Sequence, residues 1–216
     1  MSAKKNSVTL VVAVLLAFIA IASGIFVSHY LYSKKRIDPN QFHGTYLETP
    51  REVEQFALTD VDNKPFTNDN LHGQWTMLFF GFTNCGYLCP TTMAELGKMY
   101  RLLQQEGVKP LPHIVMISID PDRDSLEKLQ HYVKAFNPQF DGATGAEDAI
   151  KKMTREMGIA YAKIALPDTN DPQKYDMQHS GAVMLFNPRG ELNAFFTTPH
   201  QATLLARDYQ MLLSQD

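Results

Sequence analysis

The chain contains two cysteines, Cys85 and Cys89, which lie between an apolar run and a predicted helix. The run at residues 77–80 predicts a buried strand, and Pro90 suits the first turn of a helix, where a missing N–H costs nothing. A helix N-terminus presents unpaired N–H groups and the positive end of the helix dipole, which favour thiolate over thiol. Because a thiolate is both a redox nucleophile and a soft ligand, this turn suits dithiol chemistry or a soft metal.

Two inert roles compete with these chemical ones. Free cysteines often pack as small buried hydrophobes. A structural disulfide between Cys85 and Cys89 would close a very short loop, and short loops gain little from cross-linking. Neither role explains why the whole cysteine content of the chain lies four residues apart at a predicted turn. The chemical roles are therefore favoured.

The composition indicates one folded domain of ordinary size with an N-terminal addition. The chain has 216 residues, of which 44% are hydrophobic and 20% are charged, so it can form a packed core. Its formal charge of −3, from 20 basic and 23 acidic residues, gives no indication of nucleic-acid binding.

The N-terminal addition has the pattern of a transmembrane anchor. Residues 8–27 carry no charge, and at ~1.5 Å per residue a helix of this length spans ~30 Å, the thickness of a hydrocarbon core. A cleaved signal peptide is the alternative, because residues 20–22 (Ala-Ile-Ala) resemble its cleavage site. The apolar run continues past that point, so we expect a short tail at 1–7 and an uncleaved anchor at 8–27.

A polar tether is expected at residues 28–55 and a folded domain at 56–216. Two lysines precede the anchor and three basic residues follow it, which weakly favours a cytoplasmic location for the domain. Within the domain, the patterns predict alternating strands and helices. A hairpin with a polar turn is expected over 57–66, further strands at 75–82, 113–119, 159–164, 182–186 and 192–196, and helices at 91–105, 124–136, 146–157 and 201–213.

This order, strand–helix–strand followed by a hairpin and a closing helix, is that of a thioredoxin-like α/β fold with a central mixed sheet flanked by helices. In that fold the dithiol follows the first central strand, and the loop before the final hairpin packs against it. His179 lies in that loop, just before the strand at 182–186. We therefore expect its imidazole to face Cys85 and Cys89.

Two thiolates and one imidazole make a three-coordinate soft site. Such a site suits Cu(I), and with an added weak ligand also Cu(II), whereas zinc normally takes a fourth ligand. A hydrogen-bonded loop histidine is the ordinary alternative for His179. The nearby acidic run at 120–124 is explained most simply as a turn after a strand, with Asp124 capping the next helix and Glu127 three residues on.

The anchor, the Cys-x3-Cys-Pro turn, the segment Ser-Ile-Asp-Pro-Asp-Arg-Asp at 118–124 and the distal His179 together resemble the Sco/SenC family. The resemblance implies a membrane-anchored, thioredoxin-like copper protein with Cys85, Cys89 and His179 as ligands. It implies delivery of copper to the binuclear copper centre of cytochrome c oxidase, or reduction of that centre's cysteines. It also implies a domain on the periplasmic side of the cytoplasmic membrane, or in the mitochondrial intermembrane space. We prefer the location that the resemblance implies to the cytoplasmic location that the basic residues weakly favour.

The chain departs from the family pattern at two places. Gly86-Tyr87 stands where Pro-Asp is usual, and Gln178 stands where an acid precedes the histidine. Less negative charge weakens cation binding and eases thiol ionisation, which moves the balance toward redox work. A thiol-disulfide oxidoreductase acting on extracytoplasmic protein disulfides is therefore the alternative to a copper chaperone, and whether the protein is an enzyme stays open.

Overall fold

The computed structural model describes residues 3–32, 37–38, 40–166 and 174–215, with the side chains of the first helix described over 13–28. This helix, α1 (Ala3–Tyr32), belongs to one compact unit, and residues 38–213 form another. Every described side chain of α1 is exposed. Among the described residues, no helix is both long enough and apolar enough to span a membrane. Side chains 8–12 of the predicted anchor, and residues 33–36 and 39 of the predicted tether, lie outside the described part.

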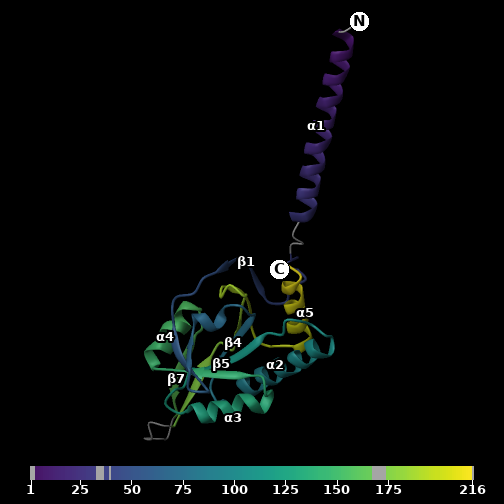
Figure 1. The fold of residues 1–216 in the computed structure, drawn as a ribbon. Helices are drawn as coiled ribbons and strands as arrows, with labels where there is room; N and C mark the ends of the chain where they lie inside the picture. The colour runs from purple at the N-terminus through teal and green to yellow at the C-terminus, as the bar shows by residue number, and fades with distance from the viewer. Residues whose placement is uncertain (1–2, 33–36, 39, 167–173, 216) are drawn as a thin grey trace. The chain divides into compact units, whose positions relative to one another are not determined.

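The second unit is built on an eight-stranded mixed sheet, in the order β1-β10-β9-β4-β5-β6-β2-β3 (Figure 1). Strands β4, β5 and β6 run parallel, and the other pairs are antiparallel. The strand bounds are β1 (Thr45–Arg51), β2 (Ala57–Asp60), β3 (Pro65–Thr67), β4 (Thr76–Gly81), β5 (His113–Ser118), β6 (Asp141–Thr144), β9 (Val183–Phe186) and β10 (Leu192–Phe196). A separate two-stranded sheet pairs β7 (Tyr161–Ala165) with β8 (Tyr175–His179).

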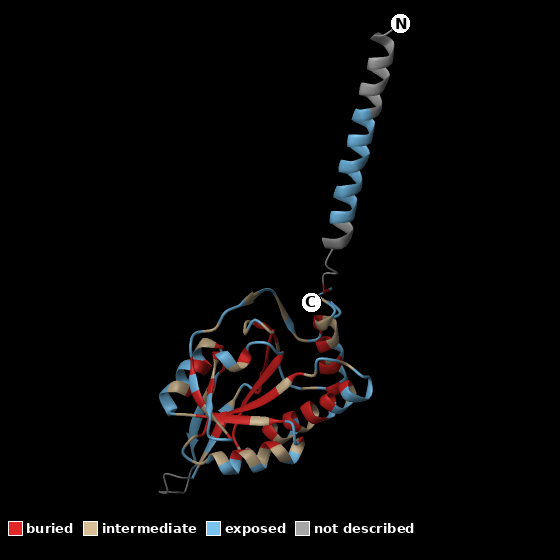
Figure 2. Ribbon diagram, viewed as in Figure 1, coloured by how far each residue is buried: buried red, intermediate tan, exposed pale blue. Residues whose placement is uncertain are grey.

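The core surrounds the central strands, which Figure 2 shows in red. All six residues of β4 are buried, as is expected of an uninterrupted apolar strand that is covered on both faces. Helix α2 (Leu88–Gln105) turns its apolar side inward and packs against α5 (Ala202–Leu213) and α3 (Leu126–Phe136). Helix α4 (Glu147–Glu156) contacts β2, and a short 3-10 helix spans Asn68–Leu71.

The fold brings three segments to one edge of the sheet. Parallel strands end at the same edge, so Gly81 at the end of β4 lies opposite Ser118 at the end of β5. Strand β9 runs the other way and begins there, with Val183 opposite Phe79. The cysteine loop after β4, the acidic loop after β5 and the segment before β9 therefore meet.

The predicted mixed α/β sheet with flanking helices is confirmed, with differences in individual elements. Strand β1 lies in the stretch predicted as a tether and pairs with β10, and β6 was not predicted. Helix α2 begins at Leu88, three residues earlier than expected, so Cys89 is in its first turn. The segment expected as a loop before the hairpin is strand β8, held by pairing with β7.

An ion-pair cluster stabilises the opposite edge of the sheet. His113 opens β5 and Asp141 opens β6, with 2.8 Å between His113 Nε2 and Asp141 Oδ2. Lys134 of α3 donates to the other carboxylate oxygen at 2.9 Å. The hydrogen bond with His113, followed by that from Lys134, lowers the pKa of Asp141, although burial acts against them.

Candidate metal centre

The two cysteines occupy opposite ends of one tight turn. Cys85 lies in the loop after β4 and is partly exposed, whereas Cys89 is the second residue of α2 and is fully buried. The Cys89 N–H, one of the free donors of the first helical turn, donates to Cys85 Sγ at 3.3 Å. A Cβ at Gly81 would lie 2.9 Å from Cys89 Sγ, so the end of β4 leaves room for the sulfur only because residue 81 is glycine.

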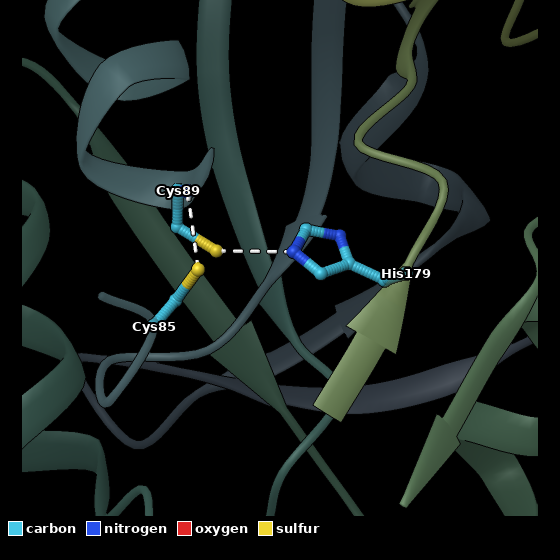
Figure 3. A group of neighbouring side chains, drawn as sticks. All are labelled: Cys85, Cys89 and His179. Carbon is cyan, nitrogen blue, oxygen red and sulfur yellow. Dashed lines mark hydrogen bonds between the residues drawn. The ribbon is translucent and has the colours of Figure 1, made fainter. Parts of the chain in front are cut away.

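His179, the last residue of β8, points its ring at this turn (Figure 3). Its Nε2 lies 3.3 Å from Cys89 Sγ. The two sulfurs and one imidazole nitrogen all lie within 4.8 Å of one another. The rings of Phe79 and Phe82 flank the imidazole, with centroids 6.0 and 5.9 Å away. The structure thus brings together the three residues that the sequence analysis singled out.

The two thiols have opposite electrostatic character. The hydrogen bond from the Cys89 thiol is the largest cause that lowers the pKa of Cys85, from 9.0 to about 3. Burial opposes this shift, while His179 and the backbone N–H groups of Cys89 and Tyr87 support it. The same hydrogen bond and burial raise the pKa of Cys89 far above its usual range. The first proton therefore leaves the pair readily and the second is held tightly.

The donor set fits a soft metal ion such as Cu(I). Two sulfurs and an imidazole are its preferred ligands, and their separations are small enough for one ion to reach all three. The Nδ1 atom of His179 is buried without a hydrogen-bond partner among the described residues. Packing against the Phe79 and Phe82 rings helps to orient this imidazole.

The prediction that Asp124 caps a helix is wrong. The cap of α3 is Ser125, whose side chain accepts from the Lys128 N–H at 3.2 Å. Asp124 is fully buried, and its carboxylate instead accepts hydrogen bonds from Thr83 and Ser118. Aspartate and serine are both common N-cap residues, but here the Ser125 side chain accepts a hydrogen bond from a backbone N–H of the first helical turn.

The acidic loop also reaches the strand that carries His179. Asp120 is fully buried and accepts hydrogen bonds from Arg123 and from the Tyr175 hydroxyl. These contacts of Asp120 and Arg123 were not predicted from the sequence. A signal was present, because charged residues directly after a buried parallel strand lie at the same edge as the loop of the neighbouring strand.

Comparison with known proteins assigns the chain to a family. Residues 44–214 match the family described as SCO1/SenC. The chain belongs to the SCO1/SenC family. The resemblance in the sequence analysis is confirmed, and the match covers all strands of the eight-stranded sheet together with β7 and β8.

Several SCO1/SenC relatives are similar over most of the chain. An SCO2-like protein of Rickettsia prowazekii is 29% identical over 192 residues, which cover 89% of this chain and 91% of that protein. The crystal structure of Arabidopsis thaliana ScoI with copper bound is 31% identical, with a TM-score of 0.69 over 76% of this chain and 99% of that one. Yeast Sco1 with copper bound is 26% identical, with a TM-score of 0.68 over 77% and 91%.

Proposed function

We propose that this SCO1/SenC protein is a copper-binding chaperone with Cys85, Cys89 and His179 as ligands. The observation that carries the proposal is the convergence of two sulfurs and an imidazole nitrogen within 4.8 Å. The copper-bound structures of the similar Arabidopsis and yeast proteins support it. The acceptor proposed is the binuclear copper centre of cytochrome c oxidase, to which the protein delivers copper or whose thiols it maintains.

Copper is the cargo of such a protein, and the three ligands differ in access. Cys85 and His179 are partly exposed, whereas Cys89 is buried. An incoming ligand from an acceptor can therefore reach the Cys85 side, while Cys89 is the enclosed ligand. The rim residues Gly86, Tyr87 and Gln178 are exposed and uncharged, so the mouth of the site offers an acceptor no formal charge from these positions.

The proposed anchor is residues 8–27, and the family resemblance supports a domain on the periplasmic side of the cytoplasmic membrane or in the mitochondrial intermembrane space. Support comes from the uncharged sequence and from the continuous 30-residue helix α1. Residues 28–55 would connect the anchor to the domain at 56–216, with β1 of that stretch joined to the sheet. Resistance to carbonate extraction and protection from added protease in oriented vesicles test both anchoring and orientation.

A Cu(I) competition experiment tests the copper proposal. Reduced full-length protein in detergent is titrated anaerobically against a calibrated Cu(I) chelator, beside Cys85→Ser, Cys89→Ser and His179→Ala. We expect one tightly bound copper in the wild type and a large loss of affinity in all three variants. His131→Ala, an exposed histidine of α3, is the matched control and should bind copper normally. A wild-type protein that cannot compete with the chelator refutes the proposal.

A second function, thiol-disulfide exchange, is favoured by the difference in exposure and pKa between the two thiols. Cys85 is partly exposed and has its pKa lowered to about 3, as suits a nucleophile. Its thiolate would attack a partner disulfide and release one partner thiolate, and Cys89 would then resolve the mixed disulfide. His179→Ala discriminates between the two functions, because it should sharply weaken copper binding and leave dithiol exchange largely intact.

A further inference from the structure

The loop between β5 and α3 holds the start of the cysteine turn. Asp124 Oδ2 accepts a hydrogen bond from the Thr83 N–H at 2.9 Å and another from Ser118 Oγ at 2.7 Å. Its Oδ1 accepts from Thr83 Oγ1 at 2.5 Å. Only Asn84 separates Thr83 from Cys85. One buried carboxylate therefore joins the end of β5 to the chain just before the first sulfur.

The same loop holds the start of the strand that carries the imidazole. Arg123 Nε donates to Asp120 Oδ2 at 2.6 Å, and Arg123 Nη1 donates to the Tyr175 carbonyl oxygen at 2.8 Å. The guanidinium carbon lies 3.7 Å from the centroid of the Tyr175 ring, whose hydroxyl donates to Asp120. Tyr175 is the first residue of β8, and His179 is the last.

Arg123 is also linked to the His179 imidazole through the Phe82 ring, which contacts both side chains. Its guanidinium carbon lies 5.9 Å from the Phe82 ring centroid. The Phe82 ring in turn meets the His179 ring edge-on, at 5.9 Å between centroids and 77° between planes. Arg123 is thus connected to the imidazole by two sets of contacts, one along β8 and one through the Phe82 ring.

These contacts matter because β8 is not a strand of the main sheet. Within the described residues it pairs with β7 in a separate two-stranded sheet, and no ladder of hydrogen bonds joins it to β4, the strand that precedes the cysteines. Asp120 and Asp124 are both fully buried. Because buried charges are expensive to desolvate, a loop that only had to turn would be better served by neutral residues.

We propose that Asp120, Arg123 and Asp124, termed here the brace, are positioning residues that set the distance between the dithiol and the imidazole. Asp124 is its cysteine arm, and the Asp120–Arg123 pair is its histidine arm. The inference rests on the proposed copper function. Each arm acts on one half of the site, which makes their effects separable by experiment.

The test measures each half of the site in the full-length protein. Cu(I) competition reports on the complete site, and the copper-free dithiol's equilibrium with glutathione reports on the cysteine half. Arg123→Gln should lower copper affinity ~10–100-fold, the effect typical of residues that orient metal ligands, and leave the dithiol equilibrium within about twofold. Asp124→Asn should change both. Asp148→Asn makes the same chemical change at an exposed side chain of α4, and should change neither.

Two milder variants keep the histidine arm testable if Arg123→Gln folds poorly. Tyr175→Phe removes only the hydroxyl that reaches Asp120, and a smaller loss of copper affinity is expected. Arg123→Lys keeps the charge without the planar fork, and its affinity should fall between those of the wild type and Arg123→Gln. Unchanged copper affinity in all three variants overturns the histidine arm. A shift of the dithiol equilibrium in Arg123→Gln as large as in Asp124→Asn overturns the separation of the arms.

A readout without copper separates failure of this inference from failure of the copper proposal. In the copper-free protein, the ring signals of His179 in two-dimensional NMR should move in Arg123→Gln and Tyr175→Phe, and stay in place in Asp148→Asn. If the wild type binds no copper but these signals move as expected, the brace is supported and the copper function is refuted. Signals that stay in place in both histidine-arm variants overturn the brace.

Discussion

Replacing Gly81 by alanine should weaken copper binding through a steric effect of known direction. A Cβ at this position would lie 2.9 Å from Cys89 Sγ and 2.8 Å from Phe79 Cε1, whereas ordinary contacts begin near 3.4 Å. The sulfur lies on a short side chain in the first turn of α2, and it would have to move by about half an ångström. Strand β4 cannot easily move instead, because all of its residues are buried in the packed core.

Two magnitudes follow from this displacement. Overpacking of a core typically costs ~1–3 kcal/mol, and at ~2–4 °C per kcal/mol for a chain of this size Tm should fall by ~2–12 °C. Metal–ligand distances are held to ~0.2 Å, so a shift of about half an ångström exceeds the tolerance of the site. Copper affinity should therefore fall by ~10–100-fold, the range found when the supports of a ligand are altered.

Gly142→Ala is the matched control for the effect on stability. A Cβ there would lie 2.7 Å from Leu129 Cγ and 3.0 Å from Val61 Cγ1. It would therefore crowd two apolar side chains and neither sulfur. Thermal melts should show similar destabilisation of both variants, while chelator competition shows weakened copper binding only in Gly81→Ala. Normal copper affinity in Gly81→Ala, or equal loss of affinity in both variants, would refute the reasoning.

Three further outcomes are expected. Because the pKa of Cys85 is lowered to about 3, iodoacetamide followed by peptide mapping should label Cys85 at pH 5 and leave Cys89 unlabelled, whereas Cys89→Ala should suppress the labelling of Cys85. Because the pKa of Asp141 is lowered in the folded state, its ionised carboxylate stabilises the fold above about pH 4. This stabilisation is lost as the pH falls through the folded-state pKa, so Asp141→Asn should lower Tm more at pH 5 than at pH 3. An equal decrease at both values would contradict that linkage. Ser125→Ala removes the cap of α3 and should lower the free energy of unfolding by ~1 kcal/mol in urea titrations, and no change would show that the cap is dispensable.

The main strands and helices could be predicted because their signals are local. The uninterrupted apolar run of β4 and the helical spacing of Met93, Leu96, Met99, Tyr100 and Leu103 on α2 indicated buried elements, and all of these side chains are buried. Strands β1 and β6 lack such signals. Five of the seven residues of β1 are polar or proline, and β6 is four residues long with a glycine and an alanine. These two segments form strands because β1 pairs with β10 and β6 pairs with β5 in the folded protein.

The three candidate ligands could also be found from the sequence, for different reasons. Cys85 and Cys89 identify themselves by residue type and spacing at a predicted turn. His179 could be selected from seven histidines only after the order of elements had indicated a thioredoxin-like fold. The structure places it at the end of a strand instead of in a loop, at the edge where β4 ends and β9 begins.

The sequence by itself determined which donor groups the candidate site contains and the order of the elements that carry them, because residue identity and periodicity are both readable from the chain. Tertiary structure alone decided how those donors are held. Asp124 and Ser125 are both good helix caps, and which one caps α3 depends on Thr83, which lies 41 residues away in the chain. A buried carboxylate satisfies whichever donors the packed fold presents to it, and only the folded chain determines those donors.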